Sequence, residues 1–369
     1  MKLSPTLTKT TLRLVQGAVA IALAATMTAC GGGDDNNSST PTSQVSASFQ
    51  VVSFGDSLSD VGTYAPNISL IFGGGRFTTN PGQVWTQDVA QYYGGSLTAA
   101  QTGGFGAAVI NNPNGYGYAQ GGALVDGAQG NGWAANGAAA LTVPVTQQIQ
   151  NYISMHGTFT NNQLVFIQGG ANDIIQQLTA ASQGLEPLAT AQANIATAAG
   201  KFVGAVAALL QAGATHVVVV DVPDIAKTPL AVLANDGGQT AAAFSAAVTA
   251  YNQGVSGALT SLGLANKVVQ VSSFQFIDSE VANFAQNGFT VGNTGTACNL
   301  ALMAQNAQRA GEANPSDFES SLFCSPQLYT VANADQTYMF ADQIHPTTHL
   351  HARFAAYVEA AVNQAFGLK

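Results

Sequence analysis

Three short segments of this 369-residue chain carry side chains suited to nucleophilic catalysis. Ser57 lies in a Gly-Asp-Ser-Leu-Ser segment, Asn172 in Gly-Gly-Ala-Asn-Asp, and Asp342 and His345 in Asp-Gln-Ile-His. An imidazole activates a serine hydroxyl by taking its proton, and a carboxylate on the other ring nitrogen fixes the tautomer. The spacing of Asp342 and His345 allows that contact within one loop. An amide such as that of Asn172 can donate to a developing oxyanion. These residue types together predict acyl-transfer chemistry.

Each segment taken alone also has a purely structural interpretation. An isolated Gly-Asp-Ser is usually a turn or a helix cap, and Asn172-Asp173 suits a turn followed by a helix. A lone Asp-x-x-His is ordinary. The catalytic interpretation therefore depends on the three segments occurring together, each directly after a predicted strand. The chain contains no Gly-x-Ser-x-Gly elbow, which disfavours an α/β-hydrolase origin for the serine.

The elements that must position these residues follow an alternating pattern. Apolar, β-branched runs predict strands at 49–54, 164–168, 216–221, 267–271 and 337–341. Longer Ala-rich stretches predict helices at 83–93, 189–212, 238–262 and 346–366. Alternation of this kind predicts an α/β fold, a three-layer α/β/α sandwich around a parallel sheet. Because the carboxyl ends of parallel strands share one edge, the three segments are expected to meet there.

Two stretches depart from this alternation. Residues 94–137 are rich in Gly, Asn and Ala, and residues 291–330 contain a pair of cysteines. Long loops at the carboxyl edge of such a sheet commonly build the site, so both are expected to frame it. Phe105, Tyr116 and Tyr118 either line an acyl pocket or anchor the first of these loops.

Taken together, the three segments resemble the motifs of the SGNH/GDSL hydrolase family of esterases and lipases. Two further segments are similar to family motifs: residues 75–80 (Gly-Arg-Phe-Thr-Thr-Asn) with Trp85 after them, and residues 119–123 (Ala-Gln-Gly-Gly-Ala). The resemblance extends from residue 49 to the C-terminus. It implies a flavodoxin-like parallel sheet and hydrolysis of small-molecule or lipid carboxylic esters through an acyl-Ser57 intermediate.

The resemblance also assigns roles. Ser57 would be the nucleophile, His345 the general base and acid, and Asp342 the residue that orients His345. The oxyanion hole would comprise the Ser57 N–H, the Gly122 N–H and the Asn172 amide. Because Gly117 stands where the family has an Asn in its glycine block, Gly121 remains an alternative donor. No cofactor is implied.

Other functions remain open at this point. The family also includes carbohydrate O-acetylesterases and lipid acyltransferases, and a non-catalytic surface lipoprotein would keep the same fold. His345, His349 and His351 raise a zinc interpretation, but catalytic zinc needs three protein ligands and the Asp342 pairing already accounts for His345. The sequence therefore predicts no metal site, with His349 and His351 on a helix face near the cleft.

The N-terminus has the features of an export signal. Lys2, Lys9 and Arg13 precede an apolar stretch at 14–25. This stretch has about a dozen residues, whereas a membrane span needs about 20. The stretch ends in Met-Thr-Ala-Cys, which resembles a bacterial lipobox and predicts lipidation of Cys30; plain signal cleavage is the alternative. We predict a signal peptide at 1–29, a lipidated Cys30 with a polar tether to residue 48, and a hydrolase domain at 49–369.

Charge and cysteine content set further bounds. The formal net charge of −9 becomes −12 without Lys2, Lys9 and Arg13, so binding to nucleic acid or an anionic membrane face is not expected. Membrane contact would be through the lipid anchor only. Gly31 after Cys30 favours an outer-membrane lipoprotein over inner-membrane retention, and a secreted or periplasmic protein is the alternative. In an exported chain, Cys298 and Cys324 are expected to form a disulfide.

Overall fold

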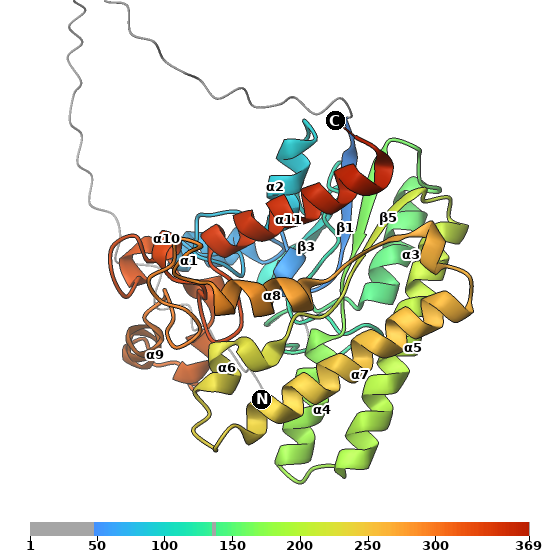
Figure 1. The fold of residues 1–369 in the computed structure, drawn as a ribbon. Helices are drawn as coiled ribbons and strands as arrows, with labels where there is room; N and C mark the ends of the chain where they lie inside the picture. Colours follow the sequence, from blue (N-terminus) through green and yellow to red (C-terminus); the bar gives the residue numbers. More distant parts are fainter. Residues whose placement is uncertain (1–47, 135–137, 369) are drawn as a thin grey trace, which may run out of the picture.

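The fold is built on a four-stranded parallel sheet with the order β1-β4-β5-β6. The computed structural model describes residues 48–134 and 138–368 (Figure 1). The strands are β1 (Gln50–Phe54), β4 (Gln163–Ile167), β5 (His216–Val220) and β6 (Val269–Val271). Phe54 at the end of β1 is in register with Ile167 at the end of β4. The carboxyl ends of the strands consequently lie at one edge.

A fifth strand position beside β1 is reduced to a single bridge. Gly117 pairs in parallel with Ser53. The Ser53 N–H donates to the Tyr116 carbonyl, and the Tyr118 N–H donates to the Ser53 carbonyl. This segment lies beside β1, on the side away from β4. The spatial order therefore matches the flavodoxin-like arrangement, in which the second strand along the chain occupies the edge of the sheet next to the first strand.

Eleven α-helices are found within the described residues. They are α1 (Ala65–Phe72), α2 (Trp85–Tyr92), α3 (Val145–His156), α4 (Ala171–Ser182), α5 (Leu188–Gln211), α6 (Pro229–Val232), α7 (Gln239–Ser261), α8 (Ser273–Ala282), α9 (Leu300–Arg309), α10 (Ala334–Thr337) and α11 (Thr348–Phe366).

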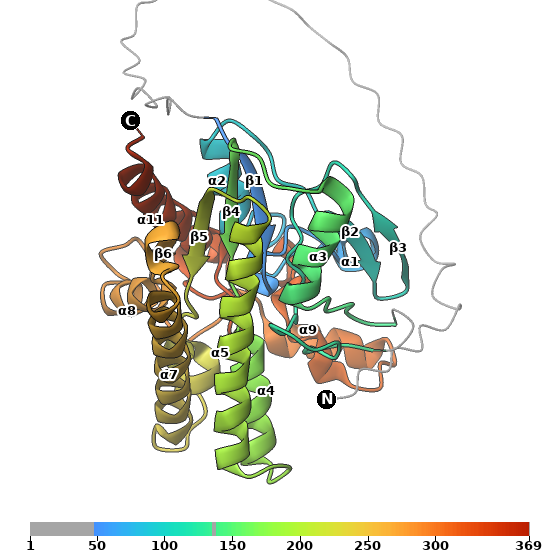
Figure 2. The same cartoon turned by 90° about the vertical axis from the view of Figure 1, so that its right-hand side faces the viewer.

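Helices cover both faces of the sheet, which confirms the three-layer α/β/α fold. Successive side chains of a strand point to opposite faces. Val52 and Phe54 join the core formed with α3, α5 and α7. Val51 joins the core formed with α2, α8 and α11. Figure 2 shows α8 and α11 on one side of the strands and α3 and α5 on the other.

Four of the five predicted strands and all four predicted helices are confirmed, with ends that differ by up to two residues. The difference that matters most for the candidate site is at the start of α11. Thr347 caps this helix by accepting a hydrogen bond from the Leu350 N–H, so the helix begins at Thr348 and Pro346 stays in the preceding loop.

The predicted strand at 337–341 is wrong. Thr337 ends α10, and the residues after it make only isolated bridges: Tyr338 with Val291, and Phe340 with Pro346. The run is apolar because Met339, Phe340 and Ala341 are buried. They are buried beneath the 291–298 loop and α11 rather than in the sheet, since the Cys298 N–H donates to the Ala341 carbonyl.

The two stretches outside the alternation have structure of their own. Residues 94–137 contain an antiparallel hairpin of β2 (Gln101–Gly104) and β3 (Ala107–Asn111), which was not predicted. Residues 291–330 contain α9 and several 3-10 turns. Tyr64, Phe77 and Phe323 belong to a small separate core that joins these stretches to α1.

Among the described residues, α5 alone has the length and apolar composition of a membrane span. In this fold it packs against α7 and α4, and its buried face includes Phe202 and Val206.

Candidate active site

The structure brings together Ser57, Asp342 and His345 at the carboxyl edge of the sheet. Ser57 begins a 3-10 turn, η2 (Ser57–Ser59), three residues after β1 ends. His345 lies in the loop before α11. The Ser57 Oγ is 2.9 Å from the His345 Nε2, and the His345 Nδ1 is 2.7 Å from the Asp342 Oδ2. With a carboxylate accepting from Nδ1–H, the Nε2 lone pair faces the serine hydroxyl.

Asp342 is held as a carboxylate. Burial would raise its pKa, but the neighbouring His345 and hydrogen bonds from the Ile344 and Ser321 N–H groups lower the pKa to about 2. The Ser321 N–H donates to Oδ2 over 2.6 Å, while Oδ1 accepts from the N–H of His345 over 2.8 Å. Asp342 is therefore ionised at neutral pH, as the orienting partner of an imidazole must be.

Three hydrogen-bond donors lie on the segments around Ser57. Within the part of the chain that the structure describes, the N–H groups of Ser57 and Gly122 have no hydrogen-bond partner. The Asn172 Nδ2 donates one hydrogen to the Ala123 carbonyl over 3.0 Å, which leaves its second hydrogen available. Ser57 and Asn172 are 8% and 7% exposed, so these donors are shielded from water and would act strongly on an oxyanion.

Gly121, the alternative donor, is already engaged. Its N–H donates to the Asp60 Oδ2 over 2.8 Å. Gly122 has a φ of +80°, and a Cβ there would lie 2.0 Å from the Asn131 carbonyl oxygen. Only glycine fits this position, and of the two candidate donors Gly121 and Gly122 it is the Gly122 N–H that has no partner among the described residues.

The presence of glycine rather than asparagine at position 117 also has a physical explanation. A Cβ at this position would lie 2.5 Å from the Val61 Cγ2, so the Asn found there in the resembling family has no room. Other residues support the glycine block in its place: Asp60 holds Gly121, and Asn131 holds Gly122.

Asn131 is a part of the site that the sequence analysis missed. Its backbone N–H donates to the Gly122 carbonyl over 2.9 Å. Its side-chain Nδ2 donates to the Asn172 Oδ1 over 2.8 Å. One residue thus fixes both Gly122 and Asn172, and it turns the Asn172 amide so that Nδ2 remains a donor. Its sequence signal, a single Asn between Gly130 and Gly132, is that of any loop.

Three buried acids hold the loops around Ser57. The Asp56 Oδ1 accepts from the Leu58 N–H, and the Asp173 Oδ2 accepts from the Val125 N–H. Asp60 accepts from Gly62, Thr63 and Gly121. Burial raises the pKa of Asp56 to about 6 and that of Asp173 to about 7.

Residues 75–80 brace the histidine loop. The Phe77 ring lies against the His345 imidazole, with ring centroids 5.0 Å apart. The Thr78 Oγ1 donates to the Pro346 carbonyl, and the Thr348 N–H donates to the Thr79 Oγ1. This motif therefore positions the imidazole and supplies no reacting group.

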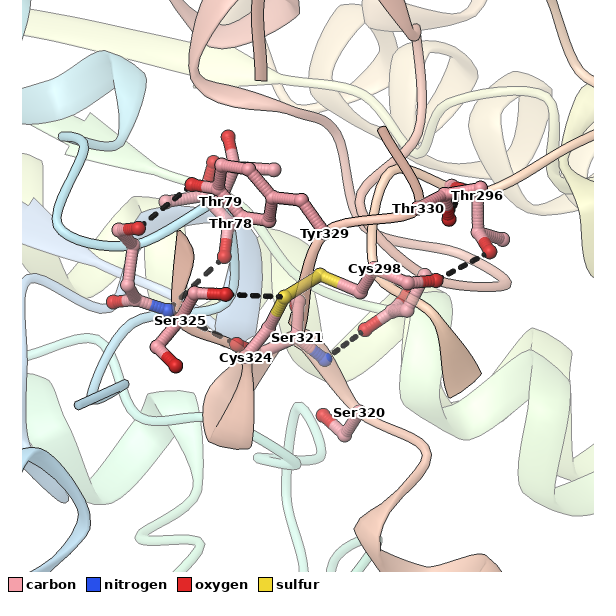
Figure 3. The surroundings of a disulfide bond; sticks show 12 residues. Thr78, Thr79, Thr296, Cys298, Ser320, Ser321, Cys324, Ser325, Tyr329 and Thr330 are labelled. Carbon is pink, nitrogen blue, oxygen red and sulfur yellow. Dashed lines mark hydrogen bonds between the residues drawn. A yellow bond between two sulfur atoms is a disulfide. The ribbon is translucent and has the colours of Figure 1, made fainter. Parts of the chain in front are cut away.

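The predicted disulfide between Cys298 and Cys324 is confirmed (Figure 3). It links two segments that both hold the acid of the site. The Cys298 N–H donates to the carbonyl of Ala341, the residue before Asp342. Three residues before Cys324, the Ser321 N–H donates to the Asp342 carboxylate. The disulfide consequently connects two of the segments that hold Asp342.

The remaining histidines are engaged separately. The His349 Nδ1 lies 2.7 Å from the Gln336 carbonyl oxygen. His351 is buried, which lowers its pKa to about 3, and its Nδ1 accepts from the Trp85 N–H. His349 is thus half-buried beside Gln336 and Phe289, whereas His351 lies inside the fold. In residues 48–134 and 138–368, no group of three or more His, Cys, Asp or Glu is arranged to hold a metal ion.

The aromatic residues of the 94–137 stretch anchor it. Tyr116 stacks on His156, and Tyr118 stacks on Phe54. Phe105 packs edge-on against Tyr64. Of the two interpretations open for these rings, the structure favours anchoring for Tyr116 and Tyr118.

A family model described as GDSL-like Lipase/Acylhydrolase matches residues 51–358 of the chain. The match includes Ser57, Gly122, Asn172, Asp342 and His345. No curated protein matches the chain. Cys30, the predicted signal peptide at 1–29 and the tether up to residue 47 lie outside both the match and the described residues.

Proposed function

We propose, since the chain belongs to the GDSL-like lipase/acylhydrolase family, that it is a serine hydrolase that cleaves carboxylic esters through an acyl-Ser57 intermediate. The observation that carries this proposal is the 2.9 Å contact between the Ser57 Oγ and the His345 Nε2, with Asp342 on the other ring nitrogen. Family membership supports a hydrolase; the geometry supports serine chemistry.

In the acylation step, the Ser57 Oγ attacks the ester carbonyl carbon while the His345 Nε2 takes the hydroxyl proton. The carbonyl oxygen becomes an oxyanion and accepts from the N–H groups of Ser57 and Gly122 and from the Asn172 Nδ2. Asp342 stabilises the imidazolium. When the C–O bond to the alcohol breaks, His345 gives its proton to the leaving oxygen, and the alcohol departs as a neutral molecule.

In the deacylation step, water attacks the acyl carbon and His345 takes one of its protons. The same donors stabilise the second oxyanion. The bond between the acyl carbon and the Ser57 Oγ then breaks, and the proton returns to Oγ. The carboxylic acid leaves and the enzyme is restored. Every proton passes through His345, so the chain's own residues complete the cycle.

The substrates that we propose are small-molecule or lipid esters of low charge. Charged residues make up only 8% of the sequence, against about 25% in an average protein. We also propose export, with lipidation at Cys30 and a bacterial outer-membrane location. The Cys298–Cys324 disulfide supports export, because such bonds persist in oxidising compartments.

The test is hydrolysis of p-nitrophenyl acetate, butanoate and palmitate by the purified chain and two variants. Ser57→Ala should abolish turnover. Ser59→Ala is the matched control in the same 3-10 turn, where its Oγ donates to Gln168, and it should keep most of the turnover. No turnover of any ester by the unmodified protein would favour a non-catalytic role instead.

A further inference from the structure

Asp56, the residue before the proposed nucleophile, carries a buried carboxyl group to which the proposed mechanism gives no role. We infer, on the premise that His345 is the general base of the proposed function, that Asp56 is a second carboxylate that stabilises the protonated form of the His345 imidazole. Asp342 orients the ring through a hydrogen bond at Nδ1. Asp56 acts on the same ring through space, so it works through His345 and is not itself a catalytic residue.

The fold brings the Asp56 carboxyl group and the His345 ring into one water-excluded region. Asp56 directly precedes Ser57, whose Oγ is 2.9 Å from the His345 Nε2. Asp56 is 1% exposed and His345 is 6% exposed. Where water is excluded the local dielectric constant is low, so a carboxylate acts strongly on a nearby imidazolium even without a hydrogen bond between them.

Only one of the two Asp56 oxygens has a structural role. Oδ1 accepts from the Leu58 N–H over 3.1 Å and so caps the η2 turn. Oδ2 is buried and has no hydrogen-bond partner among the described residues. The cap needs one oxygen, which the amide of an Asn provides as well as a carboxylate does, whereas a buried carboxylate with an unpaired oxygen costs free energy. A negative charge that acts on His345 accounts for an acid at this position.

The pKa of Asp56 reflects the same interaction from the side of the acid. Burial raises this pKa to about 6, and the Leu58 hydrogen bond and the charge of His345 limit the rise. Such an interaction is reciprocal: because protonated His345 favours the ionised form of Asp56, ionised Asp56 favours the protonated form of His345. Above about pH 6 the Asp56 carboxylate is available for this purpose.

The other ionisable groups that act on Asp56 are two acids and a phenol. The charge of Asp60 adds to the rise in the pKa of Asp56. Asp173, whose pKa burial raises to about 7, and Tyr251, whose pKa burial raises well above its usual value, are both influenced by the charge of Asp56. Tyr251 therefore stays neutral at neutral pH, whereas Asp173 changes its charge in the same range as Asp56.

The other ionisable groups that act on His345 keep their charge in that range. Burial opposes the ionisation of Asp342, but the neighbouring His345 and the hydrogen bonds to the carboxylate lower its pKa to about 2. Burial lowers the pKa of His351 to about 3, so this ring is neutral. A step in the titration of the His345 ring near pH 6 would consequently come from Asp56.

The experiment follows the His345 ring by NMR in protein with ¹⁵N-labelled histidine, with His345→Ala to assign its signal. Asp56→Asn removes the charge, while the amide oxygen can still accept from the Leu58 N–H. The midpoint of the His345 titration should move to lower pH by at least about half a unit, since an opposite charge nearby is worth about 1–3 units at closest approach. The acid limb of kcat/KM for p-nitrophenyl acetate should move in the same direction, because it reports the free enzyme.

Asp88 on α2 provides the matched control. Burial raises its pKa to about 6 as well, and its Oδ2 is likewise buried without a hydrogen-bond partner among the described residues. No hydrogen bond or charge interaction joins it to Ser57 or His345 in the described part of the chain. Asp88→Asn should therefore leave the His345 midpoint and the acid limb at their wild-type positions.

A measurement on the wild type does not depend on how any variant folds. Two interacting groups show each other's titration steps, so the wild-type His345 ring should titrate over a wider pH range than a single proton gives. Asp56→Asn should reduce this curve to one step, and Asp173→Asn should leave its width in place.

A one-step His345 curve in the wild type would overturn the inference. So would an unchanged midpoint in Asp56→Asn, or an equal shift in Asp88→Asn. These results leave the proposed function intact, because the ring signal does not depend on turnover. A wild type that shows the coupled titration but hydrolyses no ester contradicts the proposed function alone.

Discussion

Asn172 offers one unused N–H to the space beside Ser57, because its other hydrogen is bound to the Ala123 carbonyl. Removing one oxyanion donor typically costs about 3 kcal/mol of barrier. We therefore expect Asn172→Ala to lower kcat about 10²-fold, with little change in melting temperature. Steady-state kinetics together with thermal unfolding checks this. An unchanged kcat would remove Asn172 from the oxyanion hole.

Asn131 should act only through Asn172 and Gly122. In Asn131→Asp the backbone N–H to Gly122 remains, but the side chain can no longer donate to the Asn172 Oδ1. We expect kcat to fall about 10-fold, since the Asn172 amide is then free to turn, while KM changes little.

A double-mutant cycle separates this role from a general structural one. In the Asn172→Ala background, Asn131→Asp should have almost no further effect on kcat, since the group that it positions is gone. If the two losses simply multiply, the side chain of Asn131 does not act through Asn172.

Among single residues, the sequence identified those site candidates that short segments of the chain indicate by themselves. Ser57 follows a recognisable strand, and Asp342 and His345 are three residues apart in one loop. The choice between Gly121 and Gly122 required the Asp60 contact, which spans 61 residues. Asn131 reaches Asn172 across 41 residues, and no periodicity or motif around Asn131 indicates a partner.

Among the elements, the loop that contains the disulfide has the clearest effect on the site. Cys298→Ser with Cys324→Ser should lower the free energy of unfolding by up to about 3.5 kcal/mol on the loop-entropy model. It should also lower kcat, because one linked segment holds Ala341, the residue before Asp342, and the other donates to the Asp342 carboxylate.

Denaturant unfolding and ester kinetics of this double variant give both quantities, and reduction of the wild-type protein should reproduce them. Loss of stability with an unchanged kcat at a temperature where the variant is folded would show that the disulfide stabilises the fold without positioning Asp342.

Helices and strands could be predicted from the sequence where the pattern of apolar residues matches the way in which the element is buried. The run Val217–Val220 is apolar throughout because β5 lies inside the sheet with both faces covered. The same signal led to the wrong prediction of a strand at 337–341. A short apolar run indicates that its residues are buried, but it does not indicate whether a sheet, a helix or a loop covers them. The β2–β3 hairpin went unpredicted because β3 is almost wholly exposed and Gly103 and Gly104 interrupt its partner strand.

For the molecule as a whole, buried acids set the expected dependence of stability on pH. Burial raises the pKa of Asp56 to about 6 and that of Asp173 to about 7, from 3.8. Between these values and about 4, the folded state binds more protons than the unfolded state, so the free energy of unfolding falls as pH rises. Asp342, with its pKa lowered to about 2, acts oppositely, and its contribution is lost as pH falls from about 4 towards 2.

We therefore expect the melting temperature to be highest near pH 4–5 and to decrease towards pH 8. Differential scanning calorimetry across this range measures it. Asp56→Asn, which removes one of the acids with a raised pKa, should reduce the slope between pH 5 and 7. A melting temperature that rises steadily from pH 5 to 8 would contradict this account of the buried acids.

The central claim, that Ser57 is the nucleophile activated by His345, has a direct measurement. The protein is treated with a fluorophosphonate, which reacts covalently with activated serines, and the labelled peptide is identified by mass spectrometry. We expect a single adduct on Ser57, with labelling lost in Ser57→Ala and strongly slowed in His345→Ala. An adduct on another serine, or equal labelling in Ser57→Ala, would contradict it.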